Sequence, residues 1–536
     1  MTEQKYVGTV SAVNSGAVTV ILDSSVTALK RELNGKTYYI GQIGSYVLIP
    51  VGKQIVVAMV SELEKKDLMI NGTSSQRFIL QVTLVGTVKA GRYERGVSML
   101  PPGDSPVYLA EDQDLAAVFS IFQRFGFSIG QLSLFEKERA FLDPNRFFGK
   151  HIALLGSSGS GKSCTVSSVL QKVVDFPDTN IILLDLHNEY QHAFPTTSNY
   201  LEVAELELPF WLMNFEELRE MFIDERDENA SSQITVLKDL IVASKKGKNP
   251  HLQDVITIDT PAYYDIAEVR ARMQFLDTEK VAGLGSGGGP KEGPFYGKFT
   301  RFLVRLDSKL NDTRYAFMFK PKIYLQTASM SDFLHRILGA DGSAKITILD
   351  LSGVPFDVVN TIVSLLARLS FDFNFWNQNR RDFPLLLVFE EAHNYLPASG
   401  EVSAARRTVE RIAKEGRKYG VSCMIVSQRP AEVSETILSQ CNNFIILRLT
   451  NPNDQKYVHS LMPDSFSGLA DVLPALRQGE ALIVGDAIPM PLRVQIDYPN
   501  PEPEGGDIKF FDKWKQSGAK TNIMEVVDKW WKQERK

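Results

Sequence analysis

Residues 156–163 read Gly-Ser-Ser-Gly-Ser-Gly-Lys-Ser and match the pattern GxxxxGK[ST] at every fixed position. An apolar run, residues 151–155, precedes them, and a helical pattern, residues 164–174, follows them. Glycines at these positions let backbone N–H groups curl around an anion without Cβ clashes. The N-terminus of the following helix adds partial positive charge. This strand–loop–helix context predicts a P-loop within an α/β fold.

A P-loop binds the phosphates of a nucleotide with the whole loop. We expect Lys162 to reach the β and γ phosphates of ATP and the Ser163 hydroxyl to hold Mg²⁺. Cys164 follows the loop directly, and its simplest interpretation is a buried helix residue. The predicted nucleotide-binding residues are Gly156, Ser157, Ser158, Gly159, Ser160, Gly161, Lys162, Ser163 and Cys164.

An ATPase also needs an acid for the metal and a base for water. Residues 385–391 read Leu-Leu-Leu-Val-Phe-Glu-Glu, which places two carboxylates at the end of a buried strand, where open α/β sheets bind ligands. We expect Glu390 to bind Mg²⁺ through water and Glu391 to polarise the attacking water. The usual first acid is Asp, so Glu390 departs from the pattern. The alternative is two solvated acids after a core strand.

Length and composition bound the remaining possibilities. The chain has 536 residues with 59 Lys and Arg against 64 Asp and Glu, a net charge of -5. This balance argues against a surface coated in basic residues, although a local basic channel is compatible with it. The three cysteines show no CxxC spacing, which supports neither zinc nor a disulfide framework. We see no signal peptide and no apolar run of the ~20 residues that a membrane helix needs, so we expect a cytoplasmic protein without membrane contact.

The strand and helix patterns divide the chain into four parts. Short β-branched runs punctuated by glycine predict an N-terminal β-barrel over residues 1–105. Apolar strands joined by helices predict a core with a parallel sheet over residues 106–205 and 315–500. Four amphipathic helices, with N-cap signals such as Asn214 and Asp265, predict an inserted helical bundle over residues 206–314. A proline-rich linker then leads to an amphipathic helix in the tail, residues 501–536.

Several further motifs surround the two halves of the site. They are DLHNEY at 185–190, EEAHNYLP at 390–397, EGRKYG at 415–420, VSQRP at 426–430, LSQC at 438–441 and RLTNPNDQ at 448–455. In this order they resemble the HerA branch of the FtsK–HerA motor ATPases. The resemblance implies a RecA-like P-loop ATPase core, with an N-terminal barrel similar to the HAS barrel of that family and an inserted helical bundle. It also implies a homohexamer with ATP at the subunit interfaces.

The resemblance assigns two more residues to the site. By motif position, Arg417 would be an arginine finger acting in trans, which stabilises charge on the transferring phosphoryl group. The alternative is a surface arginine paired with Glu415 or solvent. Gln428, at a strand end, resembles the γ-phosphate sensor, the alternative being a surface amide. Arg146 and Lys150 are imperfect candidates for a basic residue that the family carries before the P-loop strand.

Two functions follow from the resemblance. The first is a hexameric ring that hydrolyses ATP to translocate double-stranded DNA through its pore. A partner nuclease or other effector would dock on the N-terminal barrel, in DNA processing or anti-phage defence. The second is an ATP-regulated hexameric scaffold that activates a separate effector, a sirtuin-like NADase or a nuclease. Candidate DNA contacts are Lys245, Lys246 and Lys248, for which ordinary solvated charge is the simpler interpretation. The apolar face of the tail helix predicts docking on a neighbouring subunit, or on its own core.

Overall fold

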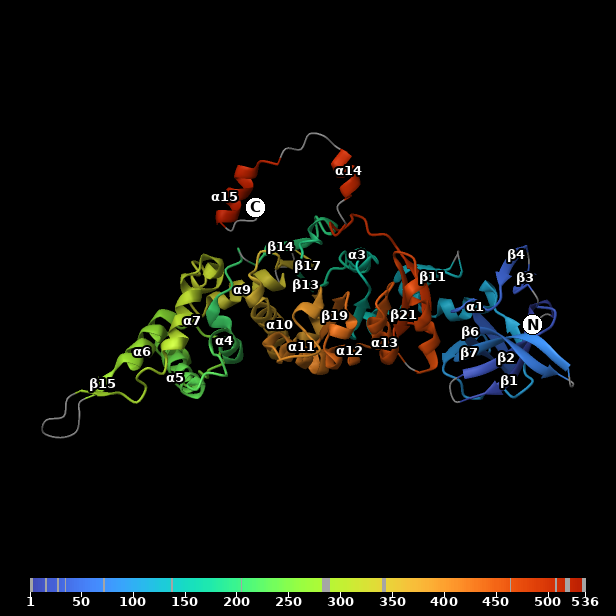
Figure 1. Cartoon of the computed structure of the whole chain (residues 1–536), viewed down its shortest axis with the longest axis horizontal. Coiled ribbons are helices and arrows are strands. Elements are labelled where there is room, and N and C mark those ends of the chain that lie inside the picture. Colours follow the sequence, from blue (N-terminus) through green and yellow to red (C-terminus); the bar gives the residue numbers. More distant parts are fainter. Residues whose placement is uncertain are drawn as a thin grey trace. The chain divides into compact units, whose positions relative to one another are not determined.

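A computed structural model describes residues 3–14, 17–26, 28–33, 35–70, 73–135, 138–203, 205–281, 290–339, 344–462, 464–506, 509–515 and 521–532. The chain divides into two compact units. Unit 1 comprises Met1–Val173, Glu391–His393 and Ser422–Pro503, and unit 2 comprises Val174–Glu390, Asn394–Val421 and Glu504–Lys536. Strands and helices alternate through much of both units (Figure 1), which confirms the predicted α/β class.

Unit 1 begins with a sheet of antiparallel strands in the order β2-β1-β9-β5-β6-β7-β8, in which β2 also pairs with β7. A separate hairpin joins β3 to β4. The β-branched runs of the sequence fall in the longer strands β1, β2, β5, β6 and β7, whereas the four-residue strands β3, β4, β8 and β9 carry no such run. The bounds are β1 Tyr6–Val13, β2 Ala17–Leu22, β3 Lys30–Leu33, β4 Lys36–Tyr39, β5 Tyr46–Val51, β6 Gln54–Ile70, β7 Thr73–Lys89, β8 Arg92–Arg95 and β9 Pro106–Leu109.

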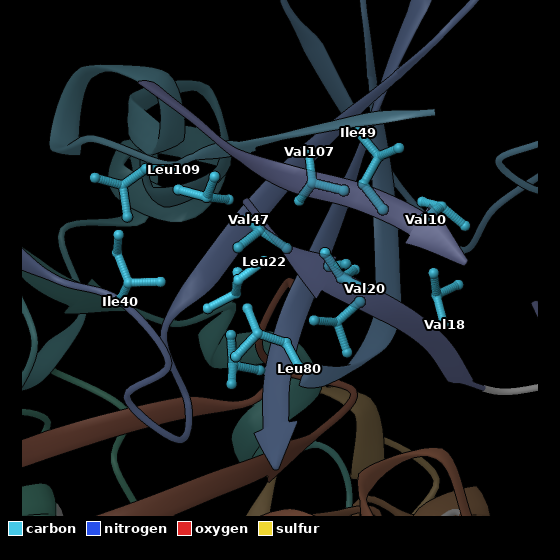
Figure 2. Close-up of a cluster of buried hydrophobic side chains, with 14 of the residues drawn as sticks. Val10, Val18, Val20, Leu22, Ile40, Val47, Ile49, Leu80, Val107 and Leu109 are labelled. Atoms are coloured by element: carbon cyan, nitrogen blue, oxygen red, sulfur yellow. The ribbon is translucent and has the colours of Figure 1, made fainter. Parts of the chain in front are cut away.

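The inner side of this sheet is an apolar core. Alternate residues of β2 are buried, as its period-2 pattern requires. Val18, Val20 and Leu80, from the paired strands β2 and β7, are fully buried and lie in one cluster of apolar side chains (Figure 2). The core therefore uses β-branched and leucine side chains on the inward face of each strand.

The rest of unit 1 is a mixed sheet in the order β11-β10-β22-β21-β20-β12-β19. β12 pairs in parallel with β19 and β20, whereas β20, β21, β22, β10 and β11 pair antiparallel. The strands are β10 Ser128–Leu132, β11 Arg139–Phe141, β12 Ile152–Leu155, β19 Val421–Ser427, β20 Asn443–Ile446, β21 Glu480–Gly485 and β22 Leu492–Ile496. The helices are α1 Asp112–Phe119, α2 Pro144–Phe148, α3 Lys162–Gln171, α12 Glu435–Ser439 and α13 Pro452–Leu461.

The end of β21 and the loop that follows it contact the N-terminal sheet. Tyr46 donates its hydroxyl to the Pro491 carbonyl at 2.7 Å, and Tyr93 donates to the Pro489 carbonyl at 3.2 Å. The guanidinium of Arg95 donates to the Gly485 carbonyl at 2.9 Å. The N-terminal sheet is thus hydrogen-bonded to the hairpin of the mixed sheet.

Unit 2 contains a parallel sheet in the order β18-β13-β17-β14. Every residue of β13, β17 and β18 is buried, which is typical of parallel strands covered on both faces. The strands are β13 Ile181–Asp185, β14 Ser198–Glu202, β17 Ile346–Asp350 and β18 Leu385–Phe389. The helices outside the insertion are α8 Ala316–Phe319, α9 Ser329–Leu338, α10 Val359–Trp376 and α11 Ala404–Glu415.

Residues 206–314, the predicted insertion, contain four longer helices. They are α4 Phe215–Phe222, α5 Ala230–Lys248, α6 Ile266–Thr278 and α7 Thr300–Asn311, with a short hairpin of β15 Lys280–Val281 and β16 Lys291–Glu292. Asn214 and Glu217 form a capping box at α4, and the Asp265 side chain caps α6. These caps satisfy backbone N–H groups that have no partner within the helix.

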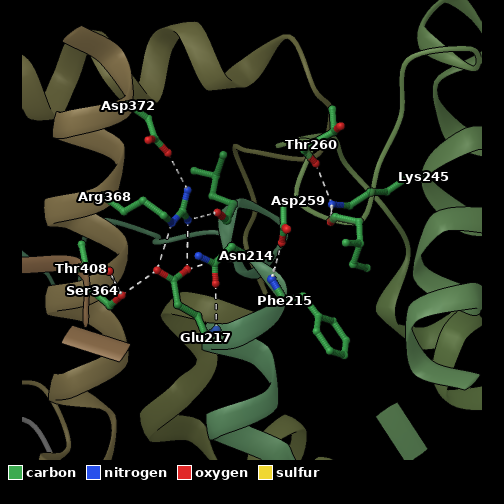
Figure 3. Close-up of polar contacts among 12 residues, drawn as sticks. Asn214, Phe215, Glu217, Lys245, Asp259, Thr260, Ser364, Arg368, Asp372 and Thr408 are labelled. Atoms are coloured by element: carbon green, nitrogen blue, oxygen red, sulfur yellow. Dashed lines mark hydrogen bonds and ion pairs between the residues drawn. The ribbon is translucent and has the colours of Figure 1, made fainter. Parts of the chain in front are cut away.

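Glu217 and Arg368 form a buried ion pair between α4 and α10 (Figure 3). Arg368 donates to Oε1 of Glu217 at 3.1 Å and to Oε2 at 3.0 Å, and Ser364 donates to Oε1 at 2.8 Å. Arg368 also donates to the Leu212 carbonyl at 2.7 Å. The Glu217 side chain is fully buried. Its charge is therefore compensated by donors on all sides, and it anchors the insertion to α10.

Lys245 is not a surface residue, so its candidacy as a DNA contact is wrong. Its side chain is 1% exposed, and its ammonium donates to the carbonyls of Ile258 and Thr260, each at 2.6 Å. Burial lowers its pKa to about 8. Lys246 and Lys248 are exposed, as solvated charges would be.

The tail contains α14 Phe510–Lys515 and α15 Ile523–Lys532. The predicted apolar face of α15 is exposed, with Ile523 at 72%, Trp530 at 72% and Trp531 at 77%. Among the described residues, no helix is both long enough and apolar enough to cross a membrane.

Candidate nucleotide-binding site

The loop between β12 and α3 turns at glycines that other residues could not replace. Gly159 and Gly161 have φ values of 69° and 103°, in the region that favours glycine. A Cβ on Gly156 would lie 2.6 Å from the Ser160 hydroxyl and 2.7 Å from Cβ of Leu447. The loop therefore exposes backbone in a shape that only this glycine spacing permits.

Neighbouring strand ends hold the loop in place. Gly156 donates its N–H to the Ser427 carbonyl at 3.2 Å, and Ser157 donates to the Arg448 carbonyl at 2.9 Å. The Ser157 hydroxyl accepts from the N–H of Thr450 at 3.1 Å. The ends of β19 and the segment after β20 thus fix the start of the loop on two sides.

Glu391 follows β18 in a left-handed turn with φ of 45°. Residues other than glycine rarely adopt this conformation, and such strain is concentrated at functional sites. Its carboxylate is 3.8 Å from the ammonium of Lys162, and both side chains are 9% exposed. The structure therefore brings together the two predicted residues that are 229 positions apart in the sequence.

His393 extends this cluster. Its Nδ1 is 3.3 Å from Oε2 of Glu391 and 3.3 Å from the Ser427 hydroxyl. Burial lowers the pKa of His393, although the nearby Glu391 carboxylate opposes this shift. Lys162 and His393 thus both lie beside the Glu391 carboxylate.

Glu390 lies in unit 2 and is 2% exposed. Its Oε1 accepts a hydrogen bond from the Tyr190 hydroxyl at 3.2 Å. Asp185, at the end of β13, accepts from the backbone N–H groups of His187, Glu189 and Tyr190. Burial raises the pKa of Asp185 despite these bonds and a side-chain hydrogen bond with Glu390. Asp185 thus shapes the segment that carries the Tyr190 donor.

The structure places the remaining predicted site residues, Gln428, Arg417, Ser163 and Cys164, on different elements. Gln428 is half-buried directly after β19 in unit 1, beside the strand that carries the loop. Arg417 is exposed in a short 3-10 helix, Gly416–Tyr419, of unit 2. Ser163 is half-buried, and so is Cys164, which corrects the expectation that Cys164 is buried.

Four residues of this region were not predicted to belong to the site: His393, Ser427, Thr450 and Gly479. The first three lie within motifs that carried the family resemblance, and these motifs were the available signal for them. Gly479 donates its N–H to the Ser160 carbonyl at 3.0 Å. No motif marks Gly479, because its contact arises only when β21 folds next to β20.

The residues present suit a nucleotide with a divalent cation. The loop presents backbone N–H groups, a helix N-terminus and a lysine, which together recognise phosphates. Ser163 in unit 1 and Glu390 in unit 2 each carry oxygen atoms of the kind that Mg²⁺ prefers as ligands. Within the described ranges, no three His, Cys, Asp or Glu side chains are grouped so that they could hold a metal ion by themselves.

Comparisons with known proteins show which family the chain resembles. The sequence model of the family described as "Helicase HerA, central domain" matches residues 127–370. The DNA double-strand break repair helicase HerA of Sulfolobus acidocaldarius is 30% identical over 438 residues, 80% of this chain and 81% of that protein. The protein of the same name from Saccharolobus solfataricus is 28% identical over 78% of this chain and 77% of its own length.

A search of solved structures found VirB4 of Thermoanaerobacter pseudethanolicus, with a TM-score of 0.49 and 16% identity over 69% of this chain and 96% of that one. The sequence relatives confirm the predicted family resemblance. They also confirm the prediction of an ATP-hydrolysing helicase or translocase.

Proposed function

The chain belongs to the HerA helicase family, and we propose that it is a homohexameric ring that hydrolyses ATP to translocate double-stranded DNA. The observation that carries the proposal is the strained Glu391, which lies 3.8 Å from Lys162 beside a complete P-loop. Relatives that cover about four-fifths of the chain are named DNA double-strand break repair helicases, which supports DNA as the substrate.

We assign the phosphates of ATP to the backbone of residues 156–164 and to Lys162. Lys162 would exchange its contact with Glu391 for the β and γ phosphates, since its distance of 3.8 Å from the carboxylate is long for a charge-assisted hydrogen bond. Glu391, released from Lys162, would accept a hydrogen bond from the attacking water and hold it in line with the γ phosphate.

Mg²⁺, bound by Ser163 and through water by Glu390, would neutralise charge on the phosphates. This assignment rests on the motifs, and the oxygen donors of both residues support it. Gln428, directly after β19, would sense the γ phosphate. Arg417 would act in trans on the nucleotide of a neighbouring subunit, which its exposure supports.

The four-part division of the chain is retained in the proposal. We interpret the N-terminal sheet as a barrel, because β2 pairs with both β1 and β7. We propose that a partner nuclease or sirtuin-like effector docks on it, in DNA processing or anti-phage defence. The apolar face of α15 would pack on a neighbouring subunit, because a helix of ten residues is marginal without a surface to cover that face.

A second candidate is an ATP-regulated scaffold that activates its effector with little translocation. Both candidates place the effector chemistry in another chain.

The decisive experiment measures ATPase activity with and without duplex DNA, and translocation against a protein roadblock. We expect stimulation by DNA and displacement of the roadblock, both lost in Glu391→Gln. Light scattering should give the mass of six chains. DNA-independent hydrolysis with a ring-dependent effector would favour the scaffold, and a monomer mass at working concentration would reject both candidates.

A further inference from the structure

The turn that enters β21 contacts the nucleotide loop from a distant part of the sequence. Gly479 donates its N–H to the Ser160 carbonyl at 3.0 Å. A Cβ on Gly161 would lie 3.4 Å from the Gly479 nitrogen, so the turn leaves little room for a side chain at position 161. All these residues belong to unit 1.

This hydrogen bond fixes the orientation of one peptide group of the loop. The Ser160 carbonyl and the Gly161 N–H belong to the same planar trans peptide, so they point in opposite directions. A donor that holds the carbonyl therefore also directs the Gly161 N–H away from Gly479. It polarises the peptide as well, which strengthens the N–H as a donor to a phosphate oxygen.

Glu480 holds the turn that carries Gly479. Its side chain is fully buried, its Oε1 accepts from Arg493 at 2.7 Å, and its Oε2 accepts from the backbone N–H of Arg477 at 3.1 Å. On the other side, Ile496 donates its N–H to the Gly479 carbonyl at 2.9 Å. The turn is thus fixed at both ends, by a buried carboxylate and by β22.

The carboxyl group of Glu480 is deprotonated at physiological pH. Burial alone would raise its pKa, but hydrogen bonds from Arg493, Ser133 and the Arg477 backbone outweigh burial and lower the pKa to about 2. Such charge-assisted hydrogen bonds are stronger than neutral ones, so they stabilise the conformation of the turn.

We propose that Glu480 is a positioning residue of the ATPase, which acts through the Arg477–Gly479 turn to aim the Gly161 N–H at the phosphates of the nucleotide. The inference rests on the proposed use of residues 156–164 as the nucleotide site. Because this N–H would bind the phosphates equally in the ground state and the transition state, its loss should raise KM with little change in kcat.

The test compares Glu480→Gln with Glu111→Gln. Glu111 is also buried in unit 1, at 2% exposure, and its carboxylate is 3.4 Å from the ammonium of Lys5 before α1. We expect Glu480→Gln to raise the Kd of a fluorescent ATP analogue and the KM for ATP about tenfold, with kcat within twofold of the wild type. Glu111→Gln should leave both constants unchanged, whatever its effect on Tm.

A wild-type Kd and KM in Glu480→Gln, with a lower Tm, would reduce Glu480 to a structural residue and overturn the proposal. If Glu480→Gln does not fold, Arg493→Lys gives a milder test, since it keeps the charge but loses the planar guanidinium. It should raise KM severalfold, and an unchanged KM there would also overturn the proposal. A wild type that binds the analogue without hydrolysing ATP would instead contradict the proposed function, while the Kd comparison would remain decisive here.

Discussion

The nucleotide loop and the junction between the insertion and α10 both bury charged side chains, but they satisfy them differently. In the loop, Lys162 lies 3.8 Å from Glu391, and Glu391 adopts a strained backbone conformation. In the junction, Arg368 binds both oxygens of Glu217 at 3.1 and 3.0 Å, and nearby within the insertion Lys245 binds two carbonyls at 2.6 Å. Figure 3 shows how these donors and acceptors of the junction face one another.

This difference distinguishes a buried charged residue that can bind a ligand from one that stabilises the fold. A buried charge with short bonds to the surrounding fold has little capacity for a ligand, and removing its partner leaves an uncompensated group. A buried charge with one long contact can exchange that contact for a phosphate. Burial of a lysine alone therefore does not indicate a site, and the length and number of its contacts discriminate between the two roles.

The largest expected effect is in the loop. Glu391→Gln should bind ATP but hydrolyse it about 100-fold more slowly or worse, because the amide cannot serve as a general base. Lys162→Ala should lose ATP binding together with turnover. Both are measured by phosphate release and by the Kd of a fluorescent ATP analogue, with Tm as the control for folding. Full ATPase activity in either variant would contradict the assignment of the site.

In the junction, Arg368→Met should destabilise the protein without a direct effect on catalysis. Removing one partner of a buried ion pair costs about 3–5 kcal/mol, because Glu217 keeps its charge without compensation. Hydrogen exchange of the α4 and α10 peptides measures the local opening. Adding Glu217→Gln should restore part of the protection, and a double variant that opens further would reject the ion pair as the cause.

Lys245→Met should have a smaller effect. The carbonyls of Ile258 and Thr260 would lose their shared donor, at a cost of about 1–3 kcal/mol. The exposed Lys246→Met is the matched control and should leave Tm unchanged. Affinity for duplex DNA should be the same in Lys245→Met and the wild type, and a loss of DNA binding in the folded variant would return Lys245 to the DNA-contacting residues.

The last expected effect is a pH dependence. Burial lowers the pKa of Lys245 to about 8, below its ordinary value of 10.5. Between these two values the unfolded chain binds more protons than the folded one, so the stabilising contribution of Lys245 should rise with pH. The difference in Tm between the wild type and Lys245→Met should therefore grow from pH 8 toward pH 10. A constant difference would show that the burial does not shift the pKa.

Local signals made much of this architecture predictable. The P-loop, the apolar strands β13, β18 and β19, and the caps at Asn214 and Asp265 each depend on residues close together in sequence. β14 was missed because its residues, Ser-Asn-Tyr-Leu-Glu, are mostly polar and half-buried at a sheet edge.

Features that depend on tertiary contacts were not predictable. The Lys245–Lys248 run reads as solvated charge, and only the turn at Ile258–Thr260 shows that Lys245 has carbonyl partners. The left-handed conformation of Glu391 is likewise invisible in a sequence where the residue type disfavours it. The contact of Gly479 with the P-loop depends on the pairing of β20 with β21, which joins residues distant from the P-loop in the sequence.

The hydrogen bonds of Tyr46, Tyr93 and Arg95 to the β21–β22 hairpin limit how this protein can be recombined with its relatives. All three acceptors are backbone carbonyls, so the contact depends on the path of the hairpin rather than on its side chains. A chimera that exchanges the N-terminal sheet alone would retain these three hydrogen bonds only if the sheet of the relative places donors opposite the same carbonyls. A chimera should therefore exchange the β21–β22 hairpin and the N-terminal sheet together.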